Sequence, residues 1–276
     1  MNAENHENAL AKDGVARNRI SGNRVSRSRI ARLAMRLLFG MVLMPGVIPV
    51  GAAADEDRLE DARERALEAA ETLREMMQIE DHAIPDYLLA RADGIAVIPN
   101  TIKGAFGIGG RGGLGLISTR QNGDWSPPLF VSIGGASVGF QIGVEATDLV
   151  LVFTEKKGLA ALVEDKVKLG ADVSVAAGPL GRKAEVGTNA TLDAAIYSYS
   201  RSKGLFAGAA LDGTVLQIDD SENENVYGKK VDARRVLDGK ADLSTPAAIR
   251  PFLVALNEVV PARESRADAR DAATHD

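Results

Sequence analysis

The chain has 276 residues, enough for one large domain or two small ones, and its 45% hydrophobic and 26% charged composition is typical of a globular protein with a true core. It contains no cysteine, which excludes disulfides, thiolate metal sites and a cysteine nucleophile. Residues 1–54 carry eight basic and three acidic side chains, so the formal charge of −5 on the whole chain becomes −10 on the remainder. A body this acidic repels a phosphate backbone, and we expect no nucleic-acid partner.

The first 54 residues have the pattern of a secretory signal. Residues 17–36 are basic and free of acids, residues 37–44 are apolar, and three alanines at 52–54 precede Asp55. This order predicts a signal peptide over residues 1–54, cleaved near Ala54–Asp55, and therefore a periplasmic or secreted protein with peripheral membrane association.

An uncleaved membrane anchor is the alternative reading of the leader. Residues 37–54 give 18 positions, which is borderline for a hydrocarbon core of about 30 Å. Pro45 and Pro49 interrupt a helix there, and small residues close the segment, so the pattern favours cleavage.

Residues 55–79 are expected to form an amphipathic helix. Its apolar positions recur at steps of three and four residues, and they are Leu59, Ala62, Ala66, Leu67, Ala70, Leu73, Met76 and Met77. The opposite face carries Arg58, Arg63, Arg65 and Arg74 among glutamates. A short second helix is expected to begin at Ile84 and Pro85, because proline suits the first helical position.

The middle of the chain reads as many short strands. Thirteen glycines lie between Gly94 and Gly143, and Asn122-Gly123 is a hairpin signal. We expect strands over 95–98, 129–133, 137–144, 148–153, 172–176, 184–190, 195–200, 205–211 and 215–218, and helices over 157–169 and 250–259. Glycine within strands marks bends, bulges or close backbone approach.

These elements predict one domain over residues 55–260 and a disordered tail over 261–276. The fold class is α+β, an antiparallel-rich curved or barrel-like sheet of short Gly-rich strands with flanking amphipathic helices.

Three patterns resemble functional motifs but lack the context that such motifs need. Residues 107–112 match G-x-G-x-x-G, yet a strand-like run follows where a dinucleotide site requires a helix. His82 is the only histidine within the expected domain, and no G-x-S-x-G nucleophile elbow accompanies it. Residues 219–225 are acidic, but they lack the glycine and distal glutamate of a calcium loop and are expected to be a polar loop. We therefore expect no cofactor, no metal and no enzyme, with an undetected catalytic site as the remaining alternative.

Two runs of residues resemble the SYLF domain family over roughly residues 60–230. They are Gly94-Ile95-Ala96-Val97-Ile98-Pro99 with the following Lys103-Gly104, and Tyr197-Ser198-Tyr199-Ser200-Arg201-Ser202-Lys203-Gly204-Leu205-Phe206-Ala207-Gly208. Eukaryotic members of that family are implicated in phosphoinositide binding and actin-associated membrane traffic. The resemblance implies an exported bacterial branch for this chain, with residues 58–77 as a membrane-facing helix.

The leader and the resemblance together predict an exported, non-enzymatic protein that binds anionic phospholipid or a membrane surface, with a phosphoinositide-like headgroup. Apolar insertion and basic headgroup contacts would combine. The expected lipid-binding residues are Arg58, Arg63, Leu67, Leu73, Met76, Met77, Lys103, Arg111, Arg201 and Lys203. The alternative is an envelope structural or protein-interaction module whose helix packs on its own sheet.

Overall fold

The computed structural model describes residues 50–121, 123–164, 166–181, 194–202, 205–208, 211 and 213–260, and at 50–55, 82, 105–108, 137–144 and 205–208 it describes the backbone alone. The helices are α2 (Val50–Gln78), α3 (Asp86–Arg91), α4 (Lys156–Glu164), α5 (Asp220–Tyr227), α6 (Ala233–Leu237) and α7 (Arg250–Val259), with 3-10 turns η1 (Glu80–His82) and η3 (Ala247–Ile249). The strands are β1 (Gly94–Gln121), β2 (Asp124–Trp125), β3 (Leu129–Phe153), β4 (Val167–Lys168), β5 (Val175–Ala177), β6 (Ile196–Ser202), β7 (Leu205–Gly208) and β8 (Val215–Ile218).

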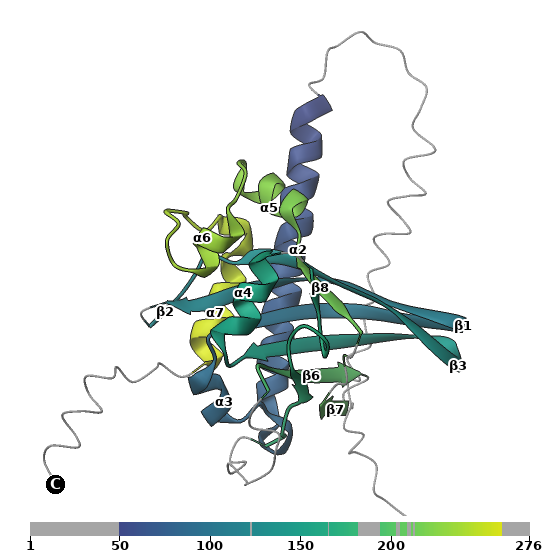
Figure 1. Cartoon of the computed structure of the whole chain (residues 1–276). Helices are drawn as coiled ribbons and strands as arrows, with labels where there is room; N and C mark the ends of the chain where they lie inside the picture. Colours follow the sequence, from purple (N-terminus) through teal and green to yellow (C-terminus); the bar gives the residue numbers. More distant parts are fainter. Residues whose placement is uncertain are drawn as a thin grey trace, which may run out of the picture. The chain divides into compact units, whose positions relative to one another are not determined.

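The strands form one mixed sheet in the order β2-β1-β3-β6-β5, with β8 joining β3 to β4 and β7 on the far end of β6. Nearly all ladders are antiparallel, and β5 pairs with β6 in parallel. The sheet curls into a half-barrel flanked by helices (Figure 1). The predicted α+β class with a curved, antiparallel-rich sheet is confirmed.

Strands β1 and β3 are far longer than expected and form a single ribbon that folds back on itself. Their register slips between the pairs Ala105↔Gly143 and Gly107↔Gly139, where three residues of β3 stand opposite one of β1, so β3 has two extra residues. Beyond the slip, β1 folds back toward its own first half, so that Gly115 packs directly against the backbone of Val97. We call residues 104–110 with 134–144 the ribbon corner, and it extends away from the helices at the right of Figure 1. The even alternation expected over 137–144 is interrupted by this slip, because extra residues on one strand break the period of two.

Alternate residues of the central strands enter two separate cores. On one face, Ile95, Val97, Val150 and Val152 pack with α2, α3 and α7. On the other face the neighbouring residues, among them Ala96 and Ile98, pack with α4 and α6. Burial on both faces explains why the sequence there reads as continuous apolar runs rather than as an alternation.

The segment expected to be an acidic loop is helix α5. Asp219 caps it, because its carboxylate accepts from the Glu222 backbone amide at 3.0 Å. Asn223, 1% exposed, joins α5 to β3: its side chain accepts from the Phe130 amide at 2.8 Å and donates to the Phe130 carbonyl at 3.1 Å. The prediction of a polar loop over 219–225 is wrong because a cap and one buried asparagine outweigh an acidic composition.

One further helix prediction needs correction, and one short helix was not predicted at all. Helix α4 ends at Glu164 rather than 169, since Val167 and Lys168 pair with β8 as strand β4. The five-residue helix α6 follows a clear cap, in which the Asp232 carboxylate accepts from the Arg235 amide, but its length gave no periodic signal. The leader, the tail and the strand expected over 184–190 lie outside the described residues, except that α2 already begins at Val50.

Two buried tyrosines give a test of this core. The Tyr199 hydroxyl is buried with no hydrogen-bond partner among the described residues, whereas the Tyr227 hydroxyl donates to the Pro128 carbonyl at 2.6 Å. Burial raises the pKa of both phenols. We expect Tyr199→Phe to leave the free energy of unfolding unchanged or raise it by about 1 kcal/mol, since it removes an unpaired polar group. Tyr227→Phe should lower it by about 1 kcal/mol or more. Urea titrations of both variants measure the free energy of unfolding. An equal decrease in the two variants would contradict the conclusion that only the Tyr227 hydroxyl is hydrogen-bonded.

Candidate functional site

Helix α2 has a buried face and an exposed face. Leu73, Met76 and Met77, three of the residues expected to contact lipid, are 0%, 2% and 9% exposed and belong to the first core. Leu59 and Leu67 remain 41% and 46% exposed. Figure 1 shows the amino-terminal end of α2 continuing past α5, beyond the rest of the described fold. From Ala62 onward one face of the helix is buried, and among its described side chains the large apolar ones left exposed are Leu59 and Leu67.

Ion pairs hold α2 to three other elements. Arg65 contacts Glu222 of α5 at 2.9 Å and lies over the Phe130 ring, 5.5 Å from its centroid. Arg74 contacts Glu258 of α7 at 2.7 Å. Glu75 pairs with Arg201 of β6. These contacts fix the helix to two other helices and to strand β6 of the sheet.

Arg201 is therefore a residue of the fold rather than an open headgroup ligand. Its guanidinium pairs with Glu75 and lies 3.5 Å from Asp148, and its side chain is only 22% exposed. Lys203, expected beside it, lies outside the described residues.

The exposed face of α2 is acidic. Between residues 56 and 71 seven carboxylates accompany three arginines. Arg58 and Arg63 are both exposed, and Arg63 lies 3.8 Å from Glu60. Leu59, Arg63 and Leu67 follow one another at four-residue steps, which places them on one face of the helix. We call these three residues the α2 stripe. A stripe set in negative charge is poorly suited to an anionic membrane.

Lys103 and Arg111 lie instead at the ribbon corner, one on each side of it. Lys103 is exposed and faces Glu145 across the ladder. Arg111 is half-buried; burial lowers its pKa, and the Glu145 carboxylate opposes that shift. From Gly104 to Gly110 and from Gly134 to Val144 the chain carries no charge. Ile102, 47% exposed, lies next to Lys103. Sequence reasoning missed Ile102, although its place between polar neighbours was visible.

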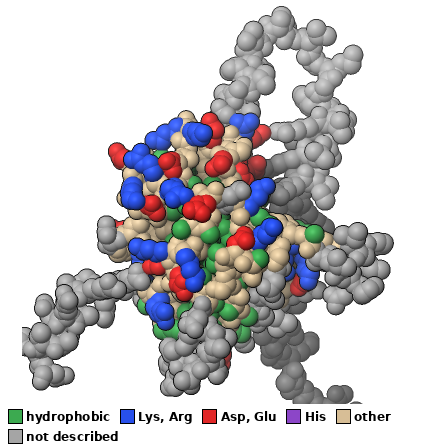
Figure 2. Space-filling model, viewed as in Figure 1, with side chains coloured by type: hydrophobic (Ala, Val, Ile, Leu, Met, Phe, Trp, Pro, Cys, Tyr) green, Lys and Arg blue, Asp and Glu red, His purple; other side chains and the backbone are tan. Residues whose placement is uncertain are grey.

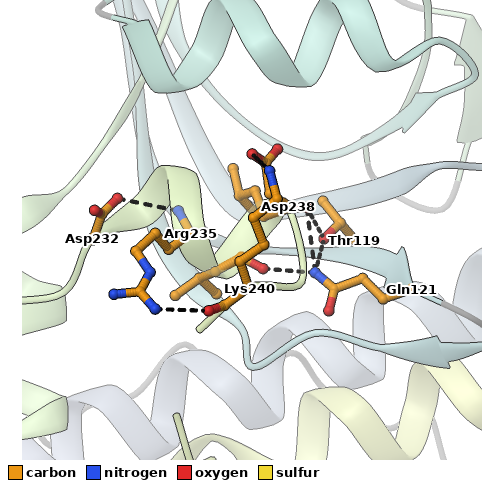
Figure 3. Close-up of polar contacts among 8 residues, drawn as sticks. Thr119, Gln121, Asp232, Arg235, Asp238 and Lys240 are labelled. Carbon is orange, nitrogen blue, oxygen red and sulfur yellow. Dashed lines mark hydrogen bonds and ion pairs between the residues drawn. The ribbon is translucent and has the colours of Figure 1, made fainter. Parts of the chain in front are cut away.

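A cleft opens on another part of the molecule, between the end of β1, helix α4 and the segment after α6. Its volume is about 590 Å³. Figure 3 shows how its wall is built: the Gln121 amide donates to the Val236 carbonyl at 2.6 Å, and the Thr119 hydroxyl donates to the Leu237 carbonyl at 3.0 Å. These bonds satisfy carbonyls at the end of α6 that a short helix leaves open.

No group of three or more His, Asp or Glu side chains that could hold a metal occurs among the described residues. No helix in that part of the chain has the length and apolar character needed to cross a bilayer. The surface in Figure 2 mixes basic and acidic side chains over α4, α5 and α6 without a large region of one sign. On that face charge is distributed in small groups of both signs.

Known proteins resemble this chain over most of its length. A family model described as "Ysc84: Las17-binding protein actin regulator" matches residues 134–259. Protein YSC84 of Saccharomyces cerevisiae is 37% identical over 177 residues, which cover 63% of this chain and 37% of that protein. An SH3 domain-containing protein of Schizosaccharomyces pombe is 40% identical over 181 residues, covering 64% and 41%. The human SH3 domain-containing YSC84-like protein 1 is 34% identical over 221 residues, covering 76% and 64%. The chain thus spans about two fifths of the length of its two fungal relatives.

These findings overturn the expected location. The similar proteins are fungal and mammalian, they are named for SH3 domains and Las17 binding, and the family description is that of an actin regulator. The prediction of a periplasmic or secreted protein is therefore wrong, and the bacterial exported branch is not supported. The three alanines taken as a cleavage site lie inside helix α2, which runs unbroken from Val50 to Gln78.

The family is described as a Las17-binding actin regulator, and relatives are named for Las17 binding or for SH3 domains. The quoted motifs of β1 and β6 lie on neighbours of the same central strand, β3, so the resemblance corresponds to one continuous sheet. The chain carries a domain of the Ysc84 family, also known as the SYLF domain.

Proposed function

We propose that this chain is a non-enzymatic module that binds the surface of a lipid bilayer through the ribbon corner. The observation that carries the proposal is the arrangement of charge: an uncharged bend of two paired strands, bordered by Lys103, Arg111 and Glu145. Apolar groups bind the boundary between headgroups and acyl chains, and cations beside them attract anionic lipid. The surface would thus lie at the corner and not along α2.

The position of Ile102 strengthens this assignment. Its side chain is 47% exposed, directly before Lys103 and two residues before the uncharged run begins. Ile102 thus adds an exposed apolar side chain at the border of the uncharged bend, close to a cation that can meet a lipid headgroup. The α2 stripe has equally exposed leucines, but its neighbours are carboxylates.

Co-sedimentation with vesicles of phosphatidylcholine and phosphatidylserine tests the proposal. We expect Ile102→Ser to lower the partition coefficient about tenfold, because it removes most of the transfer free energy of one large apolar side chain. Lys103→Gln should lower it about fivefold on these vesicles and have little effect on pure phosphatidylcholine, since one basic group near an anionic surface contributes about 1 kcal/mol.

Leu67→Ser is the matched control for Ile102→Ser. Leu67 is 46% exposed, so the same kind of change is made at the same accessibility on α2. Its partition coefficient should equal that of the unaltered chain. If Leu67→Ser weakens binding and Ile102→Ser does not, α2 is the contact. If the unaltered chain sediments with neither vesicle, the lipid proposal fails.

Protein docking on the α2 stripe is a second candidate function. The favouring observation is that Leu59 and Leu67 are exposed among carboxylates on one face of α2, whose amino-terminal end extends past α5 (Figure 1). Such a surface suits a partner with an apolar and basic face. The family description names Las17 as a bound protein, which makes Las17 the first partner to test. The Leu67→Ser variant separates the two functions, because it would lose the protein while keeping the vesicles.

A further inference from the structure

The cleft beside α4 has one apolar wall. Leu159, Ala160 and Val163 project from α4, and Leu237 closes the wall from the end of α6. Ala160 is exposed and Val163 half-buried. A cleft of about 590 Å³ lies within the size range of small-molecule sites, which are largely apolar with a few placed polar groups.

Three basic groups also line the cleft. Arg120 comes from the end of β1, Lys156 from the first residue of α4, and Lys240 from the loop after α6. The Arg120 guanidinium lies over the Trp125 ring at 5.0 Å from its centroid. Two acids, Asp93 and Asp238, also line the cleft, so its formal charge is +1 on a body of net negative charge.

The basic side chains of the cleft differ in whether an ion pair already engages them. Lys240 already contacts the Asp238 carboxylate at 3.1 Å. Lys156 is exposed, and among the described residues no ion pair engages it, whereas its neighbour Lys157 pairs with Glu155 at 2.7 Å. Lys156 is thus available to an anion that enters the cleft, and Arg120, which is half-buried, lines the same cleft.

The wall that carries Lys240 is fixed in place. Gln121 and Thr119 bond to the end of α6, and the Arg235 guanidinium donates to the Lys240 carbonyl at 3.0 Å (Figure 3). Gly239 turns the chain with φ +73°, and a Cβ there would lie 2.8 Å from the Gln121 side chain. Preorganised groups lose less entropy on binding a ligand.

We propose that this cleft binds a single anionic amphiphile: a phosphate or carboxylate head held by Lys156, Arg120 and Lys240, with an apolar stem along Leu159, Ala160 and Val163. The site is separate from the ribbon corner and does not depend on vesicle binding. It joins residues from three elements that lie up to 120 positions apart in the chain.

Isothermal titration with octyl phosphate, below its micelle concentration, tests the proposal on the full chain. The double variant Lys156→Gln with Lys240→Gln should bind octyl phosphate about tenfold more weakly, because two charge-assisted contacts at a partly exposed site are lost. Lys157→Gln, the same change on the next residue of α4 and outside the cleft, should bind like the unaltered chain. Octyl glucoside, which has the same stem and no charge, should bind at least tenfold more weakly than octyl phosphate.

Further arms identify the ligand chemistry. Octanoate in place of octyl phosphate distinguishes a carboxylate from a phosphate head, and inorganic phosphate alone should bind weakly because it lacks the stem. Ala160→Trp fills the cleft from an exposed position and should abolish binding while the thermal unfolding midpoint stays unchanged. The proposal is overturned if octyl phosphate does not bind, if octyl glucoside binds equally well, or if neither the double variant nor Ala160→Trp changes the affinity.

Discussion

Replacing Leu73 by alanine should lower the free energy of unfolding by about 2–5 kcal/mol, the range for removing a fully buried leucine from a packed core. Leu73 is 0% exposed and lies in the core formed by α2, α3, α7 and one face of the sheet. Its loss leaves a cavity that close-packed neighbours fill only in part. Urea unfolding followed by far-ultraviolet circular dichroism measures the change.

Leu67→Ala is the control on the same helix, since it makes the same chemical change at 46% exposure. It should shift the free energy of unfolding by less than about 0.5 kcal/mol. A cost at Leu67 equal to that at Leu73 would show that the helix lies differently on the sheet. A small cost at Leu73 would show that α2 is only loosely attached and free to leave for a membrane.

This contrast bears on function because lipid insertion by the whole helix would require α2 to detach. Detachment exposes Leu73 and Met76 and separates Arg74 from Glu258 and Glu75 from Arg201. Each buried side chain contributes about 1.5–3 kcal/mol to keeping the helix in place. A contact at the ribbon corner needs no such rearrangement, which is a physical reason to prefer it.

The helical period of α2 was predictable, but its two environments were not. Leu59, Leu67 and Leu73 all satisfy the same three- and four-residue spacing. Which of them is buried depends on which side of the helix meets α5, α7 and the sheet, and α5 and α7 lie more than a hundred residues farther along the chain. A periodic pattern shows that a face is apolar and leaves open what covers it.

The candidate sites were less visible in the sequence for a similar reason. Glycines within strands predicted bends and close approach, and the curved sheet follows from them. The fold-back joins short apolar runs into two strands of 28 and 25 residues, which no local signal announced. The cleft depends on Arg120, Lys156 and Lys240, which no spacing connects until β1, α4 and the loop after α6 meet.

Replacing Gly115 by alanine should lower the free energy of unfolding by about 3 kcal/mol or more, at the upper end of overpacking costs. A Cβ at Gly115 would lie 2.1 Å from the Val97 carbonyl oxygen and 2.8 Å from the Ile98 Cα. Both are backbone atoms, so no side-chain rotation relieves the contact. The first and second halves of β1 would have to separate at the point where the ribbon returns.

Gly112→Ala is the matched control, because a Cβ there meets nothing within 4 Å, three residues earlier in the same strand. It should be neutral or stabilise by up to about 1 kcal/mol through the entropy of the unfolded chain. Urea titrations of both variants measure the difference, and equal stabilities would contradict the fold-back. The same two variants can be tested in vesicle co-sedimentation. The ribbon corner keeps its shape only while β1 folds back on itself. Under folding conditions Gly115→Ala should therefore reduce the fraction of protein that sediments with vesicles, and Gly112→Ala should not.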